Sequence, residues 1–124
     1  RIIPKDSIAI ITRVGVGKLA FMPFSYASSQ DFLSLSGLKL DGVFTAYALH
    51  KKLQSKRHVV QGTSIKGITK EELLINTIMV PHYADEQHQI GIFFTNLDRL
   101  IALHQRELTK LQNIKKALLE KMFV

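Results

Sequence analysis

The sequence predicts an α+β protein, in which a small mixed α/β domain is followed by one long C-terminal coiled-coil helix. In residues 1–83, short apolar runs separated by turn residues indicate strands and short helices. From residue 84 onward, apolar residues recur at alternating spacings of four and three, which is the period of a coiled coil. We therefore predict two domains, residues 1–83 and residues 84–124.

The first expected elements form a β-hairpin. Ile8 to Thr12 (IAIIT) and Leu19 to Met22 (LAFM) are short apolar runs of the length and composition of strands. Gly15 and Gly17 lie between them, and glycine permits the tight bend that joins two antiparallel strands. A hairpin with its turn at these glycines is therefore predicted.

Two further strands are expected in the first domain. Phe32 to Leu40 (FLSLSGLKL) alternates apolar and polar residues, and Gly37 within it is read as a bulge. Thr77 to Val80 (TIMV) is expected as the last strand, ended by Pro81, which has no amide hydrogen to donate.

Two helices are expected between these strands. The first runs from Val43 to Leu53 after Asp41 as N-cap, and no proline interrupts it. Its apolar residues near one face are Val43, Phe44, Tyr47, Ala48 and Leu53. A second helical turn, Leu73 to Ile75, follows a capping box in which Thr69 and Glu72 can each accept a hydrogen bond from the other's backbone amide.

The long C-terminal helix is predicted from a seam of about 38 residues, which is roughly 57 Å at the rise of an α-helix. The seam consists of Ile90, Phe94, Leu97, Ile101, His104, Leu108, Leu111, Lys115, Leu118 and Met122. Of these, the apolar positions Ile90, Phe94, Leu97, Ile101, Leu108, Leu111, Leu118 and Met122 are the expected coiled-coil interface. Phe93, Leu100, Leu103, Ile114 and Leu119 widen the stripe.

Such a helix needs a partner, because each leucine left in water forfeits about 1.5 to 3 kcal/mol. The alternative is that the helix lies back on its own domain. Its length of roughly 57 Å exceeds the diameter of a domain of about 85 residues, which favours a separate partner helix.

The net charge of +7 is concentrated in the first domain. Residues 1–83 contain eleven Lys and Arg against five Asp and Glu, whereas residues 84–124 contain six against five. A basic domain joined to a nearly neutral helix is typical of a surface that binds a polyanion, next to a part with another task. A merely soluble basic protein is the alternative.

Nucleic acid is the polyanion that the residue types favour. Basic side chains that could contact phosphates are Arg13, Lys18, Lys51, Lys52, Lys56, Arg57 and Lys66. Amide and hydroxyl side chains that could contact base edges or phosphate oxygens are Gln30, Gln61, Thr63 and Ser64. All of them are expected in turns or near helix ends, although each one alone could be a solvated surface residue.

Sequence patterns for catalysis are missing. The stretch TRVGVGK has Thr12 where a phosphate-binding loop needs its first glycine, and Leu19 where that loop needs a hydroxyl for magnesium. The five histidines are scattered, cysteine is absent, and no acidic cluster resembles a metal site. We expect no catalytic residue, no metal and no cofactor in this chain. The composition also favours a soluble cytoplasmic protein without membrane contact.

The chain resembles the C-terminal half of the specificity subunit of bacterial and archaeal type I restriction-modification systems, most specifically in its own second half. ITKEELLINTIMVP (Ile68 to Pro81) is similar to the end of that family's target recognition domain. EQHQIGIFFTNLDRLIALHQRELTKLQNIKKALLEKMF (Glu86 to Phe123) is similar to its conserved-region helix, except that Gly91 stands where a helix former is expected. IITRVGVGKLAF (Ile10 to Phe21) resembles its Arg/Gly-rich hairpin.

The resemblance implies a DNA-binding subunit without catalysis of its own. Residues 1–83 would be a target recognition domain, incomplete at its N-terminus, and residues 84–124 the helix that acts as spacer and docking surface. The chain would recognise one half of a bipartite DNA target. Its partners would be double-stranded DNA, the methyltransferase subunits, the restriction subunit, and a second helix from the same subunit or from another copy. S-adenosylmethionine, ATP and magnesium would belong to the partner subunits.

Two other functions remain open at this point. The chain could be a coiled-coil scaffold whose basic surface is incidental, or the recognition end of a fused restriction-methyltransferase enzyme. If neutralising the basic residues abolishes salt-dependent DNA binding, the chain binds DNA and is not merely a scaffold.

Overall fold

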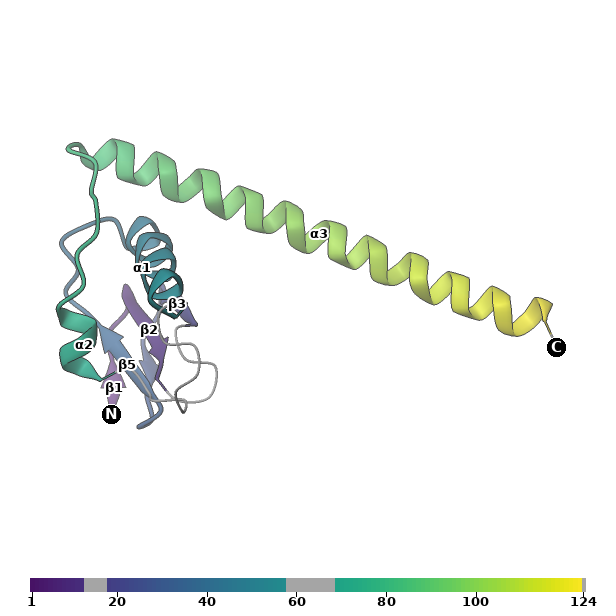
Figure 1. Ribbon diagram of the computed structural model, residues 1–124, viewed down its shortest axis with the longest axis horizontal. Helices are drawn as coiled ribbons and strands as arrows, with labels where there is room; N and C mark the ends of the chain where they lie inside the picture. Colours follow the sequence, from purple (N-terminus) through teal and green to yellow (C-terminus); the bar gives the residue numbers. More distant parts are fainter. Residues whose placement is uncertain (13–17, 58–68, 124) are drawn as a thin grey trace. The chain divides into compact units, whose positions relative to one another are not determined.

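The computed structural model describes residues 1–12, 18–57 and 69–123. Its elements form an α+β fold: short strands and two helices come first, and one long helix ends the described chain (Figure 1). By its internal contacts the chain divides into two compact units, residues 1–91 and 92–124. The predicted division between residues 83 and 84 stays a prediction. The α+β class predicted from the sequence is confirmed.

A three-stranded antiparallel sheet is the centre of the first unit. It has the order β3-β2-β5, from β2 (Ser7–Ile11), β3 (Leu19–Met22) and β5 (Phe32–Leu35). In the register of β2 and β3, Ser7 pairs with Met22 and Ile10 with Leu19, which confirms the predicted hairpin strands. The predicted turn at Gly15 and Gly17 lies outside the described residues.

A second antiparallel pair joins β1 (Ile2–Ile3) to β4 (Tyr26–Ala27). Ile3 is buried, and the Ser28 amide donates to the carbonyl oxygen of Arg1 at 2.9 Å, which extends this pairing by one step. Strands of two residues lack a periodic signal, and the sequence therefore did not predict this pair as a sheet.

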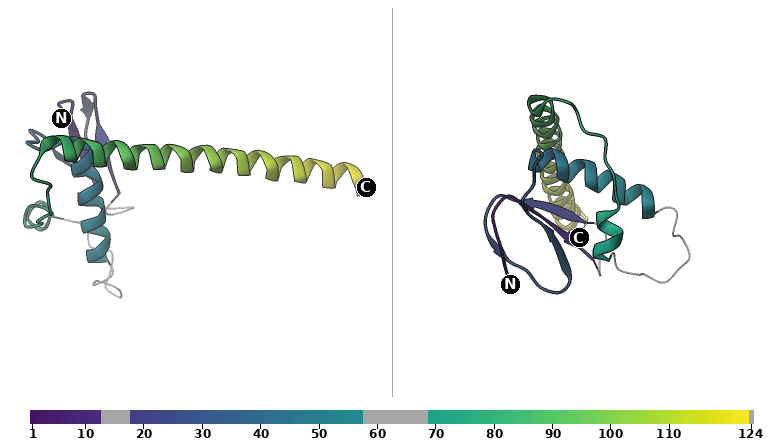
Figure 2. Two further views of the ribbon diagram at one scale, coloured as in Figure 1. Left: turned by 90° about the horizontal axis from the view of Figure 1, so that it is seen from above. Right: turned by 90° about the vertical axis from the view of Figure 1, so that its left-hand side faces the viewer.

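The core lies between one face of the larger sheet and the helices. Helix α1 (Gly42–Arg57) packs on β2 and β3, as Figures 1 and 2 show from three directions. Ile8 and Ile10 are fully buried under it, and the helix contributes Ala46, Leu49 and Leu53. Leu73 of the short helix α2 (Lys70–Leu74) completes this cluster.

Two predicted strands are wrong in extent or in kind. Strand β5 ends at Leu35, and Gly37 beyond it is no bulge: its φ of +66° is the left-handed conformation that turns the chain out of the strand. Thr77 to Val80 is not a strand, because no described strand pairs with it and Met79 is 94% exposed. Apolar composition alone cannot supply the neighbouring edge that a strand requires.

The predicted apolar face of α1 is also partly wrong. Phe44 and Leu53 are buried as expected, but Val43, Tyr47 and Ala48 are only half-buried. The residues that face the sheet are Ala46, Leu49 and Leu53, at spacings of three and four. Val43 and Phe44 instead lie beside the start of the long helix α3 (Ala84–Met122), so that α1 buries two sides rather than one.

The capping box before α2 is confirmed. The side-chain oxygen of Thr69 accepts from the Glu72 amide at 3.2 Å, and the Glu72 carboxylate accepts from the Thr69 amide at 3.4 Å. This reciprocal pair fixes the start of a helix of only five residues.

Two neighbouring leucines in α2 test where the core lies. Leu73 is 5% exposed and Leu74 is 62% exposed, although both belong to the same helix. Leu73→Ala should lower the free energy of unfolding by about 2 to 5 kcal/mol, because it empties space in the core. Leu74→Ala should change it by no more than about 0.5 kcal/mol. Urea denaturation measures both, and equal losses would contradict this core.

Candidate nucleic-acid interface

The basic side chains predicted to contact DNA belong to the first unit. Lys18 directly precedes strand β3 and is exposed, and its carbonyl oxygen accepts from the Ile11 amide at 2.9 Å. Lys51 is exposed and Lys52 is half-buried on α1, while Lys56 and Arg57 are the last two residues of that helix. The last turns of α1 thus concentrate positive charge at the end of the helix where cations are favoured.

The remaining predicted contacts divide into one that is described and five that are not. Gln30 is exposed in the turn before β5. Arg13, Gln61, Thr63, Ser64 and Lys66 lie outside the described residues. The assignment of all eleven residues to DNA stays a prediction.

Lys18 also lies at the edge of a cleft of about 350 Å³ in the first unit. The cleft includes Ile11, Met22, Tyr26 and Phe32, so that its surface is mainly apolar. The hydroxyl of Tyr26 donates to Ser34 Oγ at 2.8 Å and fixes the tyrosine ring. A cation beside an apolar surface is an arrangement that can hold a phosphate while a flat ring packs next to it.

The start of α3 is fixed to α1 by a joint that we define as Asp41, Gln87, His88 and Gly91, all within the first unit. The Asp41 amide donates to Gln87 Oε1 at 3.1 Å, and Gln87 Nε2 donates to the Pro81 carbonyl oxygen at 3.4 Å. Gln87 is only 6% exposed, so both ends of its amide are used inside the protein.

Asp41 has two roles in this joint. Its Oδ1 accepts from the Phe44 amide at 2.9 Å, which confirms the predicted N-cap of α1, and its Oδ2 lies 3.1 Å from His88 Nδ1. Burial raises the pKa of Asp41, but the hydrogen bond from the Phe44 amide and the contact with His88 lower it by more. The pKa of Asp41 therefore lies below its ordinary value of 3.8.

Gly91 lets the two helices approach closely. A Cβ atom at this position would lie 3.3 Å from the Phe44 amide nitrogen, 3.3 Å from Val43 Cγ1 and 3.4 Å from Asp41 Oδ1. Since one of these neighbours is backbone, it cannot turn aside as a side chain can. This explains why glycine stands where the sequence pattern expects a helix former.

The sequence did not assign a role to Gln87, His88 or Gly91. The only signal was that Glu86-Gln87 matched the family pattern and that Gly91 departed from it. Polar residues in the first turns of a helix are ordinary, and their partners on α1 are more than forty residues away in sequence.

The predicted coiled-coil residues lie along α3. Ile90 is half-buried in the first unit, whereas Phe94, Leu97, Ile101, Leu108, Leu111, Leu118 and Met122 are 39–74% exposed. Every described residue of the second unit is exposed except Thr95, which is intermediate. The interface role of these positions stays a prediction.

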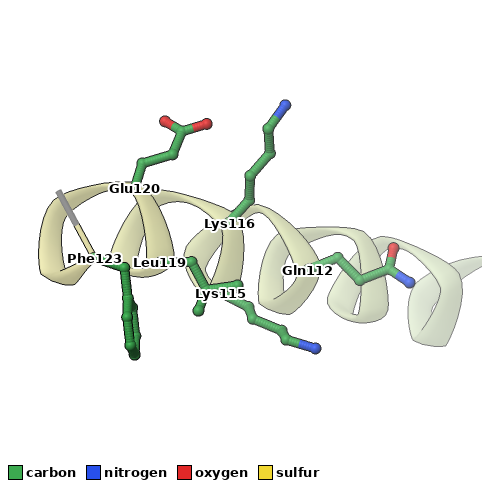
Figure 3. Close-up of a pocket in the computed structure, with 6 residues that line it drawn as sticks. All are labelled: Gln112, Lys115, Lys116, Leu119, Glu120 and Phe123. Carbon is green, nitrogen blue, oxygen red and sulfur yellow. The ribbon is translucent and has the colours of Figure 1, made fainter.

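Figure 3 shows the C-terminal end of α3. Lys115, Leu119 and Phe123 extend from one side of the helix, and Lys116 and Glu120 extend from the other. The residues that line this hollow belong to α3, apart from Phe123 directly after its last residue, so it is an open surface rather than an enclosed pocket. Leu119 and Phe123 thus share their side of the chain with Lys115, while Lys116 and Glu120 lie on the opposite side.

Residues 1–12, 18–57 and 69–123 show neither a cluster of metal-ligating side chains nor a helix that could span a membrane. No group of three or more potential ligand side chains there is placed to hold a metal ion. Likewise, none of the helices in these ranges has both the length and the apolar character that crossing a bilayer demands.

The first test of the joint concerns Asp41. Asp41→Ala should lower the free energy of unfolding by about 0.5 to 2 kcal/mol, because α1 loses its cap, whereas Asp41→Asn should cost less, because asparagine also caps helices. The lowered pKa adds a stabilisation that is complete above pH 3.8 and is lost as the pH falls through the folded-state value. The difference between wild type and Asp41→Asn should therefore shrink below pH 3.8 in urea titrations; a constant difference would contradict this.

The second test concerns Gly91. Helix propensity alone would make Gly91→Leu raise the free energy of unfolding by up to about 1 kcal/mol. The contact with the Phe44 backbone reverses the sign, so we expect a loss of about 1 to 3 kcal/mol in thermal or urea unfolding. Gln89→Leu is the matched control, because Gln89 is exposed two residues earlier in the same helix. A stabilised Gly91→Leu variant would show that the helices do not pack here.

Comparison with known structures agrees with this architecture. A chain from a structure that describes complex assembly and conformational transition of the type I R-M system matches with a TM-score of 0.77 and 18% identity, over 95% of this chain and 29% of that one. The type I restriction-modification S subunit from M. genitalium matches with a TM-score of 0.65 and 17% identity, over 94% of this chain and 32% of that one.

At these identities the two matches show a shared fold, and the chain spans about a third of the length of either protein. The sequence itself matches the family described as type I restriction modification DNA specificity domain over residues 1–113. This match includes the strands, α1, α2 and α3 as far as residue 113. The chain therefore belongs to the family of type I restriction-modification DNA specificity domains, as its sequence had suggested.

Proposed function

We propose that this chain recognises one half of a bipartite DNA sequence and docks methyltransferase subunits, without catalysing a reaction itself. The strands together with α1 and α2 are called the sheet domain here. The observation that carries the proposal is that one family match runs through both this sheet domain and most of α3. The two parts therefore belong to one functional unit, in which the sheet domain binds DNA and the helix provides spacing and assembly.

The chemistry of each part supports this division of tasks. The first unit presents Lys18 and Lys51 to solvent, and such side chains neutralise phosphates. The second unit presents a stripe of exposed apolar side chains, which binds other helices and not DNA. Methylation and cleavage, with S-adenosylmethionine, ATP and magnesium, would then belong to the partner subunits.

Selection of bound sites from random duplex DNA tests the recognition role. The chain is used together with the methyltransferase subunits, and bound duplexes are sequenced after several rounds. An enriched half-site sequence is expected, because base-edge contacts discriminate against each wrong pair by about 1 to 3 kcal/mol. A bound pool without any enriched sequence would contradict a recognition role and favour the scaffold alternative.

Neutralising the end of α1 tests the predicted phosphate contacts. The variant Lys51→Gln, Lys52→Gln, Lys56→Gln, Arg57→Gln should weaken DNA binding and lower the slope of log affinity against log salt by about 0.9 for each lost contact. The matched control removes four other positive charges from the first unit: Arg1→Gln, Lys5→Gln, Lys39→Gln, Lys70→Gln, all exposed.

Both variants have the same net charge, so a general electrostatic effect would change both slopes equally. We expect the α1 variant to lose much more of the slope than the control. Equal slopes in a titration from about 50 to 200 mM salt would show that the end of α1 does not contact DNA.

A further inference from the structure

Four basic side chains form a row along the second unit, which we call the basic row: Arg99, Arg106, Lys110 and Lys121. All four are exposed. At 3.6 residues per turn they fall within about 60° of one another around α3, and they extend over about 33 Å of its length. Four cations spread over this length of one helix face form an extended charged surface.

The basic row lies away from the apolar seam. The seam positions from Phe94 to Met122 centre about 150° from the row around the helix, so a partner helix on the seam leaves the four basic residues accessible. Leu103 and Ile114, which widen the apolar stripe, fall within or next to the arc of the row, and the aliphatic parts of arginine and lysine side chains can cover such neighbours.

The basic row is not neutralised by its own helix. Residues 92–124 contain six Lys and Arg but only three Asp and Glu, and the acidic residues Asp98, Glu107 and Glu120 lie outside the row. Among these carboxylates, Glu107 contacts a histidine of the same helix, with its Oε2 atom 3.7 Å from His104 Nδ1. An ordinary solvated helix face mixes both signs of charge, and this row has one sign.

We infer that the basic row binds the phosphate backbone of duplex DNA outside the recognised bases, as a contact without sequence preference. Duplex DNA presents one negative charge per about 1.7 Å of its axis, and a row of four cations is complementary to this high charge density. The inference rests on the proposed function, which brings a duplex to this chain. It adds a second DNA-binding surface, on α3, to the predicted one on the sheet domain.

The competing occupant is an acidic surface of a partner protein. DNA is favoured because the chain belongs to a DNA specificity family and because the row continues over about 33 Å without a carboxylate. A protein partner would need an equally long line of unpaired acidic residues, which is rare because proteins mix charges on their surfaces.

The experiment compares three forms of the chain: wild type, the row variant Arg99→Gln, Arg106→Gln, Lys110→Gln, Lys121→Gln, and the control variant Arg1→Gln, Lys5→Gln, Lys39→Gln, Lys70→Gln. Glutamine keeps the helix propensity of the replaced residues. Affinity is measured against salt concentration on two duplexes of equal length, one that carries the selected site and one in which that site is scrambled. Circular dichroism and sedimentation confirm that helix content and association are unchanged.

For the row variant we expect the salt slope to fall by about 0.9 for each lost phosphate contact, equally on both duplexes. The ratio of the two affinities should stay at the wild-type value, because phosphate contacts carry no sequence information. The double variant Arg106→Gln, Lys110→Gln should lower the salt slope by about half as much as the quadruple variant. It replaces the quadruple variant in the test if that variant does not fold.

Three results overturn the inference. The first is a row variant with the slope of the control, and the second is a collapse of the affinity ratio, which would make the row a base-reading surface. The third is an unchanged slope with loss of binding to the methyltransferase subunits, which would assign the row to a protein partner. A wild-type chain that does not distinguish the two duplexes contradicts the proposed function instead, and the slopes still report on the row.

Discussion

The apolar stripe of α3 is exposed along the second unit, and only a further surface can bury it. Leu108, Leu111, Leu118 and Met122 are 51–74% exposed, and each such side chain gains about 1.5 to 3 kcal/mol when another surface buries it. A single helix of 39 residues supplies no such surface to itself. The second unit thus presents a surface suited to packing against another helix, whereas the proposed recognition of bases belongs to the first unit.

The joint between α1 and α3 links these two tasks. Gln87 and His88 bind the residue that caps α1, and Gly91 permits the contact with the backbone of Phe44. The first two turns of α3 therefore belong to the first unit, although the helix continues to Met122. The proposed spacer role requires that the start of α3 be held firmly, and three polar contacts and one close packing contact hold it here.

Features that depend on neighbouring residues in sequence were predictable. The capping box of Thr69 and Glu72, the cap at Asp41 and the period of α3 are local patterns, and the structure contains all of them. Features that depend on distant partners were not. Thr77 to Val80 has the composition of a strand but no edge to pair with, and Gln87 is important only because Asp41 lies beside it. The candidate DNA contacts were predicted from residue type. Residue type does not determine which of these side chains lie on the same surface.

Analytical ultracentrifugation of the 124-residue chain tests whether the stripe of α3 needs another helix. If the stripe of α3 requires another helix, the chain should self-associate with rising concentration, and Leu108→Gln with Leu111→Gln should shift it to monomer. Thr109→Gln with Asn113→Gln, on the polar side of the same turns, should leave association unchanged. A wild-type chain that stays monomeric at high concentration, or a control that dissociates like the leucine variant, would contradict the account.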